Sequence, residues 1–123
     1  MRDFLLKTLL RSTTACVYVC SLVNEKGQKD GPTERHILTR DLDHIEQFVG
    51  QWDIPGRGTF ISVSTLKPNS RRVKSNAMET AFFHVDVDFK SIDITVDEAF
   101  EALKNCTHPP TLIVSSGHGL HTY

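Results

Sequence analysis

Two aspartates separated by a single residue are the residues of this sequence best suited to do chemistry. Asp86 and Asp88 lie in the run FHVDVDFK, which alternates as a β-strand does. Side chains two positions apart on a strand point to the same face, so the two carboxylates project together. They repel each other unless a cation lies beside them, and Mg²⁺ is commonly held by one or two carboxylates together with nucleotide phosphates. The pair therefore predicts a divalent-metal site, although the polar, solvent-facing side of an amphipathic strand gives the same pattern.

A glycine-rich turn near the end of the sequence is a candidate for binding phosphate. The run SGHGLH begins at Ser116 and contains Gly117, Gly119 and His121. Glycine permits positive φ and close approach of a ligand to the backbone, and N–H groups in such a turn can surround a phosphate. We expect His121 to contact a triphosphate, with Lys90 as a further nucleotide-binding candidate. A hairpin turn with a partly buried His121 is the alternative interpretation.

A basic stretch over residues 65–76 is the third candidate. It contains Arg71, Arg72 and Lys74, which we expect to contact the phosphates of a nucleic acid, so that binding weakens with added salt. No aromatic residue lies among them, so the stretch does not predict a surface that stacks bases. A solvated loop is the alternative. The net charge of the whole chain is −1 and adds no support for a nucleic-acid partner.

The elements that must position these residues follow from the spacing of apolar side chains. Helices are expected at 3–10, 41–52 and 95–105, the second capped by Asp41 and the third by a capping box of Thr95 and Glu98. Strands are expected at 15–23, 33–38, 59–64, 79–89, 111–115 and from Leu120 onward. The strongest strand is expected at 79–89, with Val85, Val87 and Phe89 facing the core, and a buried strand at 111–115. This order predicts an α+β fold with a mixed or antiparallel sheet and helices packed on it.

Composition is typical of one soluble globular domain. The chain has 123 residues, of which 39% are hydrophobic and 24% charged. Cys16 and Cys20 lie in an apolar stretch and are expected to be buried thiols, which suits a reducing cytosol. No uninterrupted apolar run is long enough to span a membrane, so we expect a cytoplasmic protein. The segment from Thr111 to Tyr123 ends within a strand, and we expect the natural protein to continue beyond it.

The two motifs taken together are more specific than either alone. An apolar strand ending in Asp-x-Asp, a helix, and an apolar strand followed by Ser-Gly-x-Gly-x-His resemble the archaeo-eukaryotic primase superfamily, and most of all the primase-polymerases of plasmids, phages and mobile elements. The matching strings are FFHVDVD at 82–88 and SGHGLHTY at 116–123. The resemblance covers residues 55–123 and implies that 1–123 form a single partial primase-polymerase domain, with an amino-terminal helix and strand region at 1–54. It implies an RRM-like catalytic core that is incomplete at its C-terminus, because the family's third motif, a later aspartate, has no match here.

The resemblance implies a DNA primase or polymerase that synthesises or extends a primer on a DNA template. A 3′-hydroxyl would attack the α-phosphate of a nucleoside triphosphate and release pyrophosphate. Asp86 and Asp88 would hold Mg²⁺ or Mn²⁺, and His121 would contact the incoming triphosphate. The pocket for that triphosphate would be shaped by Ser116, Gly117 and Gly119. A helicase domain or partner is expected in the full-length protein. Two other classes stay open: a non-catalytic nucleic-acid or nucleotide-binding module, and a metal-dependent nuclease that uses the same aspartates and histidine.

Overall fold

The chain forms an α+β structure made of two compact units, Met1–Ala81 and Phe82–Tyr123. A computed structural model describes residues 2–7, 9–11, 14–24, 32–80, 82–90, 92–115 and 119–123. Within these ranges the strands form two small antiparallel sheets, each of three strands, in place of the one sheet expected. Each unit is described by itself below. No helix in the described part of the chain is both long and apolar enough to cross a lipid bilayer.

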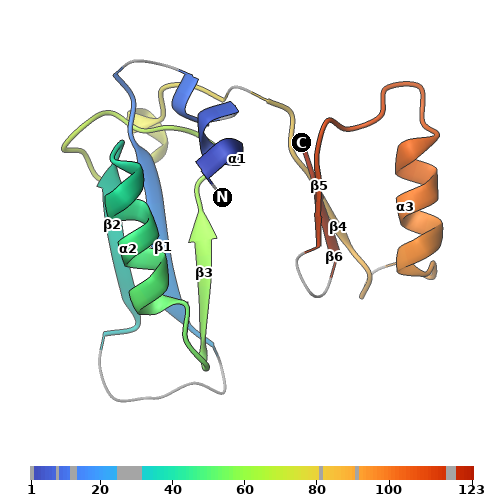
Figure 1. Ribbon diagram of the computed structural model, residues 1–123, viewed down its shortest axis with the longest axis horizontal. Helices are drawn as coiled ribbons and strands as arrows, with labels where there is room; N and C mark the ends of the chain where they lie inside the picture. Colours follow the sequence, from blue (N-terminus) through green and yellow to red (C-terminus); the bar gives the residue numbers. More distant parts are fainter. Residues whose placement is uncertain are drawn as a thin grey trace. The chain divides into compact units, whose positions relative to one another are not determined.

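The first unit is a three-stranded sheet with an α-helix packed on one face (Figure 1). Its elements are α1 (Arg2–Lys7), the 3₁₀ turn η1 (Leu9–Arg11), β1 (Val17–Val23), β2 (Glu34–Thr39), α2 (Leu42–Trp52), β3 (Arg57–Ile61) and the 3₁₀ turn η2 (Lys74–Asn76). The strand order is β2-β1-β3, and β1 runs antiparallel to both neighbours. Strands β2 and β3 are therefore parallel to each other on either side of β1, with α2 as the crossover between them. This is a split β-α-β arrangement.

The core of the first unit forms around β1 because this strand is covered on both edges and both faces. Val17 and Val19 are fully buried, and α2 contributes Ile45 and Phe48 to the core. The start of α2 is set locally, because the Asp41 carboxylate accepts from the backbone N–H of Asp43 at 2.9 Å and of His44 at 3.3 Å.

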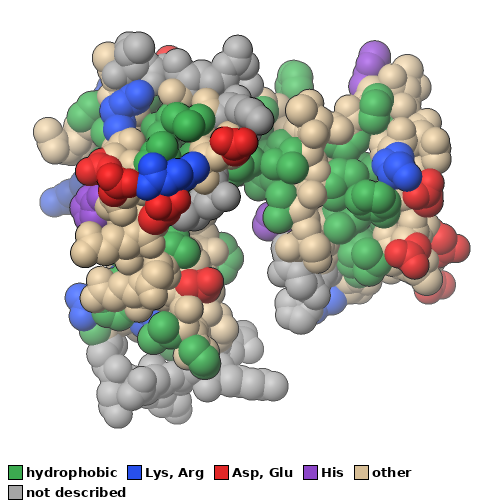
Figure 2. Space-filling model, viewed as in Figure 1, with side chains coloured by type: hydrophobic (Ala, Val, Ile, Leu, Met, Phe, Trp, Pro, Cys, Tyr) green, Lys and Arg blue, Asp and Glu red, His purple; other side chains and the backbone are tan. Residues whose placement is uncertain are grey.

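The strands of the second unit follow the same split β-α-β order, with the central strand last in the sequence. It contains β4 (Val85–Asp88), α3 (Val96–Lys104), β5 (Ile113–Ser115) and β6 (Gly119–Thr122). The strand order is β4-β6-β5, and β6 is antiparallel to both neighbours, so β4 and β5 are parallel with α3 between them in the sequence. Helix α3 begins with the expected capping box of Thr95 and Glu98. Figure 2 shows hydrophobic side chains gathered between this sheet and the helix.

Several expectations are confirmed. The hairpin of β1 and β2, helix α2 with its Asp41 cap, helix α3 with its capping box, and the final strand lie where the sequence pattern placed them. Cys16 and Cys20 are buried. Burial raises the pKa of the Cys20 thiol, and the charge of Glu34 adds to this. The region 3–10 is helical but divides into α1 and η1.

The expected long strand at 79–89 is wrong in extent, because β4 covers only Val85–Asp88. The residues before it are bonded elsewhere: Met78 donates to the Thr65 carbonyl oxygen, and Thr65 donates to that of Glu79, both at 2.9 Å. Residues 77–79 therefore belong to the first unit. The expected β3 at 59–64 begins earlier and ends earlier, at Arg57–Ile61.

The expected burial is wrong for Val85 and for the strand at 111–115, whereas Val87 and Phe89 are partly buried. Val85 is 55% exposed and Val114 in β5 is 40% exposed. Both residues lie on the outer strands of a three-stranded sheet. An outer strand has a neighbouring strand on one side only, so its side chains are less covered. The central strand carries the burial instead, since Leu120 in β6 is only 3% exposed.

Candidate functional site

Pairing of β4 with β6 brings the aspartate motif and the histidine motif side by side. In the antiparallel register Asp86 lies opposite His121, and Asp88 lies opposite Gly119. Residues two apart share a face of the sheet, so both carboxylates and the imidazole project from the same face. Positions more than thirty residues apart in sequence are thus neighbours on two strands.

The Asp86 and His121 side chains approach each other across the strands. The distance between Asp86 Oδ1 and His121 Nε2 is 3.5 Å, and the two side chains are 60% and 35% exposed. In this exposed setting the pair is a weak attraction when the imidazole is protonated. Both groups stay accessible to a ligand that approaches the face.

Asp88 is held by its own turn. One of its carboxylate oxygens, Oδ1, accepts a hydrogen bond from the backbone N–H of Lys90 at 2.9 Å, which is the geometry of an Asx turn. This bond orients the carboxylate at the end of β4. The residue is exposed, as is Lys90, whose side chain leaves the turn directly after the strand.

Aromatic side chains on the same face were not assigned a role from the sequence. The His84 ring lies 5.5 Å from that of His121 and 5.1 Å from that of Tyr123, and Phe82 lies 5.0 Å from Tyr123 edge to face. Burial raises the pKa of the Tyr123 phenol, and the negative charge of Asp86 adds to this. The sequence contained a signal for these residues. His84 is two positions from Asp86 and Tyr123 is two positions from His121, so strand alternation predicts that they share the face of the motif residues.

Gly119 lies where two backbones come close together, and its expected part in a triphosphate pocket stays a prediction. A Cβ at this position would lie 2.1 Å from the carbonyl oxygen of Val87 and 3.4 Å from the Cα of Asp88. Among the described residues the only glycine with positive φ is Gly56, so backbone freedom is not what position 119 requires. Glycine is needed there because the backbones of β4 and β6 come close together.

Two of the expected phosphate-binding residues, Ser116 and Gly117, lie outside the described residues. The described neighbours on either side are the ends of β5 and β6, joined in the register Ser115↔Leu120. The role of the turn itself stays a prediction.

The basic residues expected to contact nucleic acid belong to the first unit. The Arg72 guanidinium carbon lies 5.4 Å from the centre of the Tyr18 ring, a cation–π contact. Arg71 and Lys74 are exposed, and Lys74 begins the 3₁₀ turn η2. These cations belong to the first unit, and Asp86 belongs to the second.

The donor chemistry of the aspartate face suits a divalent cation in part. Across the described ranges, no three side chains of His, Cys, Asp or Glu gather closely enough to hold a metal ion. Asp86 and Asp88 nevertheless offer exposed carboxylate oxygens on one face, which is the part of a Mg²⁺ site that protein side chains commonly supply when nucleotide phosphates complete it. The two carboxylates therefore fit a shared protein–nucleotide metal site better than a site made by the protein alone.

No family model, curated protein or solved structure matches the chain.

Proposed function

We propose that this chain carries the nucleotide-binding half of a primase-polymerase active site and acts in metal-dependent nucleotidyl transfer on DNA. The observation that carries the proposal is the β4–β6 register, which sets Asp86 opposite His121. The Asp-x-Asp and Gly-x-His motifs are thereby adjacent on one open face. If the polar residues of the two strands were only solvent-facing, the two motifs would not need to lie side by side.

The residues of this face have separate roles in the proposed reaction. Asp86 and Asp88 would hold Mg²⁺ or Mn²⁺ together with the triphosphate, and such an ion would supply stabilisation of the charge that develops on the transferred phosphoryl group. His121 binds the triphosphate from the neighbouring strand. The Lys90 backbone N–H keeps the Asp88 carboxylate in place. The incoming nucleotide therefore lies across β4 and β6, and the wider fold is proposed to be an RRM-like core.

Titration calorimetry of the 123-residue chain tests this proposal, with Mn²⁺ as the metal and a nucleoside triphosphate as the ligand. We expect nucleotide binding that needs Mn²⁺ and that weakens at least about tenfold, about 1.4 kcal/mol, in an Asp86→Asn/Asp88→Asn variant. Asp93→Asn/Asp97→Asn is the matched control, because it removes the same charge from the same unit away from β4. His121→Ala should weaken nucleotide binding and leave the binding of Mn²⁺ alone unchanged.

Two results would contradict the proposal. One is a folded wild-type chain that binds no nucleotide at millimolar Mn²⁺. The other is a site variant and a matched control that bind equally well. Incorporation of nucleotides on a primed template, lost in the site variant, would then test the catalytic step.

A non-catalytic nucleic-acid or nucleotide-binding module is the second candidate. It is favoured by one observation, that no three His, Cys, Asp or Glu side chains of the described residues gather closely enough to hold a metal ion. This candidate predicts single-stranded DNA binding that survives chelation of metal and loss of both aspartates. A nuclease, by contrast, predicts DNA degradation with metal and without any nucleoside triphosphate.

A further inference from the structure

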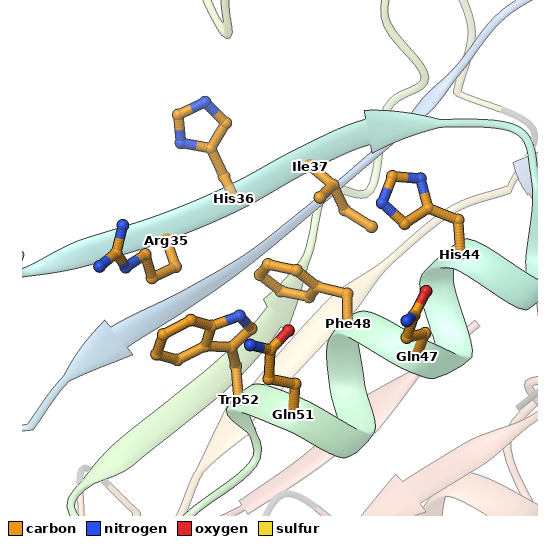
Figure 3. A pocket seen from close by; sticks show the side chains of 8 residues that line it. All are labelled: Arg35, His36, Ile37, His44, Gln47, Phe48, Gln51 and Trp52. Atoms are coloured by element: carbon orange, nitrogen blue, oxygen red, sulfur yellow. The ribbon is translucent and has the colours of Figure 1, made fainter.

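A groove between β2 and α2 of the first unit takes no part in the proposed reaction. It has a volume of about 350 Å³. Figure 3 shows Phe48, Gln51 and Trp52 projecting from α2 toward β2, with Arg35 and Ile37 directed to them from the strand. The groove thus has an apolar floor of Phe48 and Ile37, with polar groups around it.

The strand beside this groove has an unpaired outer edge. Strand β2 ends the order β2-β1-β3, and no other strand of the described residues pairs with it. The backbone N–H of Val23 donates to the Thr33 carbonyl oxygen at 3.0 Å, in line with the β1–β2 register. Antiparallel strands bond at every second residue. The N–H and C=O groups of Glu34, His36 and Leu38 therefore point away from β1, toward the free edge.

The charges around the groove favour an anionic ligand. Arg35 and His44 face it together with the amides of Gln47 and Gln51, whereas the His36 ring projects to the other side of β2, and none of the described lining residues has a carboxylate. The carboxylate on β2 itself is already engaged: Glu34 accepts from the Tyr18 hydroxyl and lies 3.2 Å from His36 Nδ1. The edge thus offers backbone hydrogen bonds beside a groove that presents the Arg35 guanidinium and the amides of Gln47 and Gln51.

We propose that this groove binds an extended acidic peptide, which adds as a fourth strand to the outer edge of β2. Its backbone bonds to Glu34, His36 and Leu38, alternate side chains enter the groove, and an acidic side chain meets Arg35. Single-stranded nucleic acid fits less well. The Trp52 ring, the lining group best able to stack a base, already has the guanidinium groups of Arg35 and Arg57 over it, at 5.1 and 5.4 Å.

The test uses a fluorescently labelled peptide of alternating glutamate and valine, matched in length to the six residues of β2, and the intact 123-residue chain. Fluorescence anisotropy should show saturable binding of this peptide and none of a lysine–valine counterpart. Methylation of the peptide nitrogens that would face β2 should abolish binding, because it removes the N–H donors. The protein itself is unchanged in this test. Arg35→Glu should weaken binding about tenfold, and Gln51→Glu several-fold.

Lys67→Glu is the matched control, because it makes the same charge change at an exposed position outside the groove; it should bind as wild type does. The proposal is overturned if the methylated peptide binds equally well, or if Arg35→Glu and Lys67→Glu are indistinguishable. It is also overturned if an oligothymidylate displaces the peptide and binds with a lower Kd than the peptide, since the groove would then be a nucleic-acid site.

Discussion

Replacement of Gly119 by alanine should separate β4 from β6 and so destroy the candidate site. The added Cβ would lie 2.1 Å from the Val87 carbonyl oxygen and 3.1 Å from its carbonyl carbon. Non-bonded heavy atoms are most stable at about 3.5–4.0 Å, so the two strands must move apart by roughly 1 Å or more. Ladder bonds of about 2.9 Å would then exceed about 3.5 Å and no longer be hydrogen bonds.

The expected loss is about 1–3 kcal/mol of stability in the second unit. It follows from two ladder bonds at about 0.5–1.5 kcal/mol each, and it agrees with the usual cost of inserting a methyl group where no space exists. The same displacement moves Asp86 away from His121, so Mn²⁺-dependent nucleotide binding should fall with it.

Native-state hydrogen exchange resolves this effect, because it reports the local opening of each backbone N–H group separately. The backbone N–H groups of Leu120 and Thr122 should exchange about tenfold to a hundredfold faster in Gly119→Ala, which corresponds to the free-energy range above. Gly50→Ala is the control. It lies in α2 with no heavy atom within 4 Å of the new Cβ, and it should stabilise the helix by about 0.5–1 kcal/mol. Unchanged exchange at Leu120 and Thr122 in Gly119→Ala, with the control behaving as expected, would refute the close-approach argument.

Three further predictions concern the capping, electrostatics and packing of single residues. Thr95→Ala should cost about 1 kcal/mol and fray the first turn of α3, visible in backbone chemical shifts. Asp86→Asn should lower the pKa of Tyr123 without returning it to its ordinary value, because burial is the larger cause; NMR of the tyrosine ring carbons measures this. Ser21→Ala should lower the free energy of unfolding by about 1–3 kcal/mol. The buried Ser21 hydroxyl donates to the Trp52 carbonyl oxygen at 3.0 Å and accepts from the Arg57 side chain at 2.9 Å. Fluorescence of the single tryptophan reports this unfolding.

Each of these has its own check. Thr95→Ser should keep the cap, and equal stability of the serine and alanine variants would contradict the capping argument. Tyr18 should be unaffected by Asp86→Asn, because its raised pKa comes from burial and from Glu34. Ser75→Ala, at an exposed serine, should change stability by less than about 0.5 kcal/mol; a Ser21→Ala variant as stable as this one would contradict the buried-network argument.

The raised pKa of Tyr123 also has a consequence for stability at high pH. Its folded-state pKa lies above the ordinary value of 10.0, so the folded state holds its phenol proton more tightly than the unfolded state. The stabilising contribution is therefore complete below about pH 10 and is lost as pH rises through the folded-state pKa. Denaturation measured on both sides of pH 10 should show this decline, and a smaller one in Asp86→Asn.

The sequence alone was sufficient for the elements whose signals are local. The carboxylate of Asp41 and the capping box of Thr95 and Glu98 act within one turn of a helix, so α2 and α3 begin where expected. The hairpin of β1 and β2 follows from two apolar runs around a turn. That Asp86 and Asp88 share a face is likewise a property of the strand backbone and does not depend on a neighbour.

Only the tertiary structure decided which strands pair and what the pairing covers. Glu79 bonds to Thr65 in the first unit, although the sequence pattern predicted a single strand over 79–89. The neighbours of Asp86 are His121 and, through it, the ring of His84, and Gly119 is required by a backbone that passes close to it. Register and burial depend on the free energy of contacts between distant segments. No periodicity along a single strand contains that information.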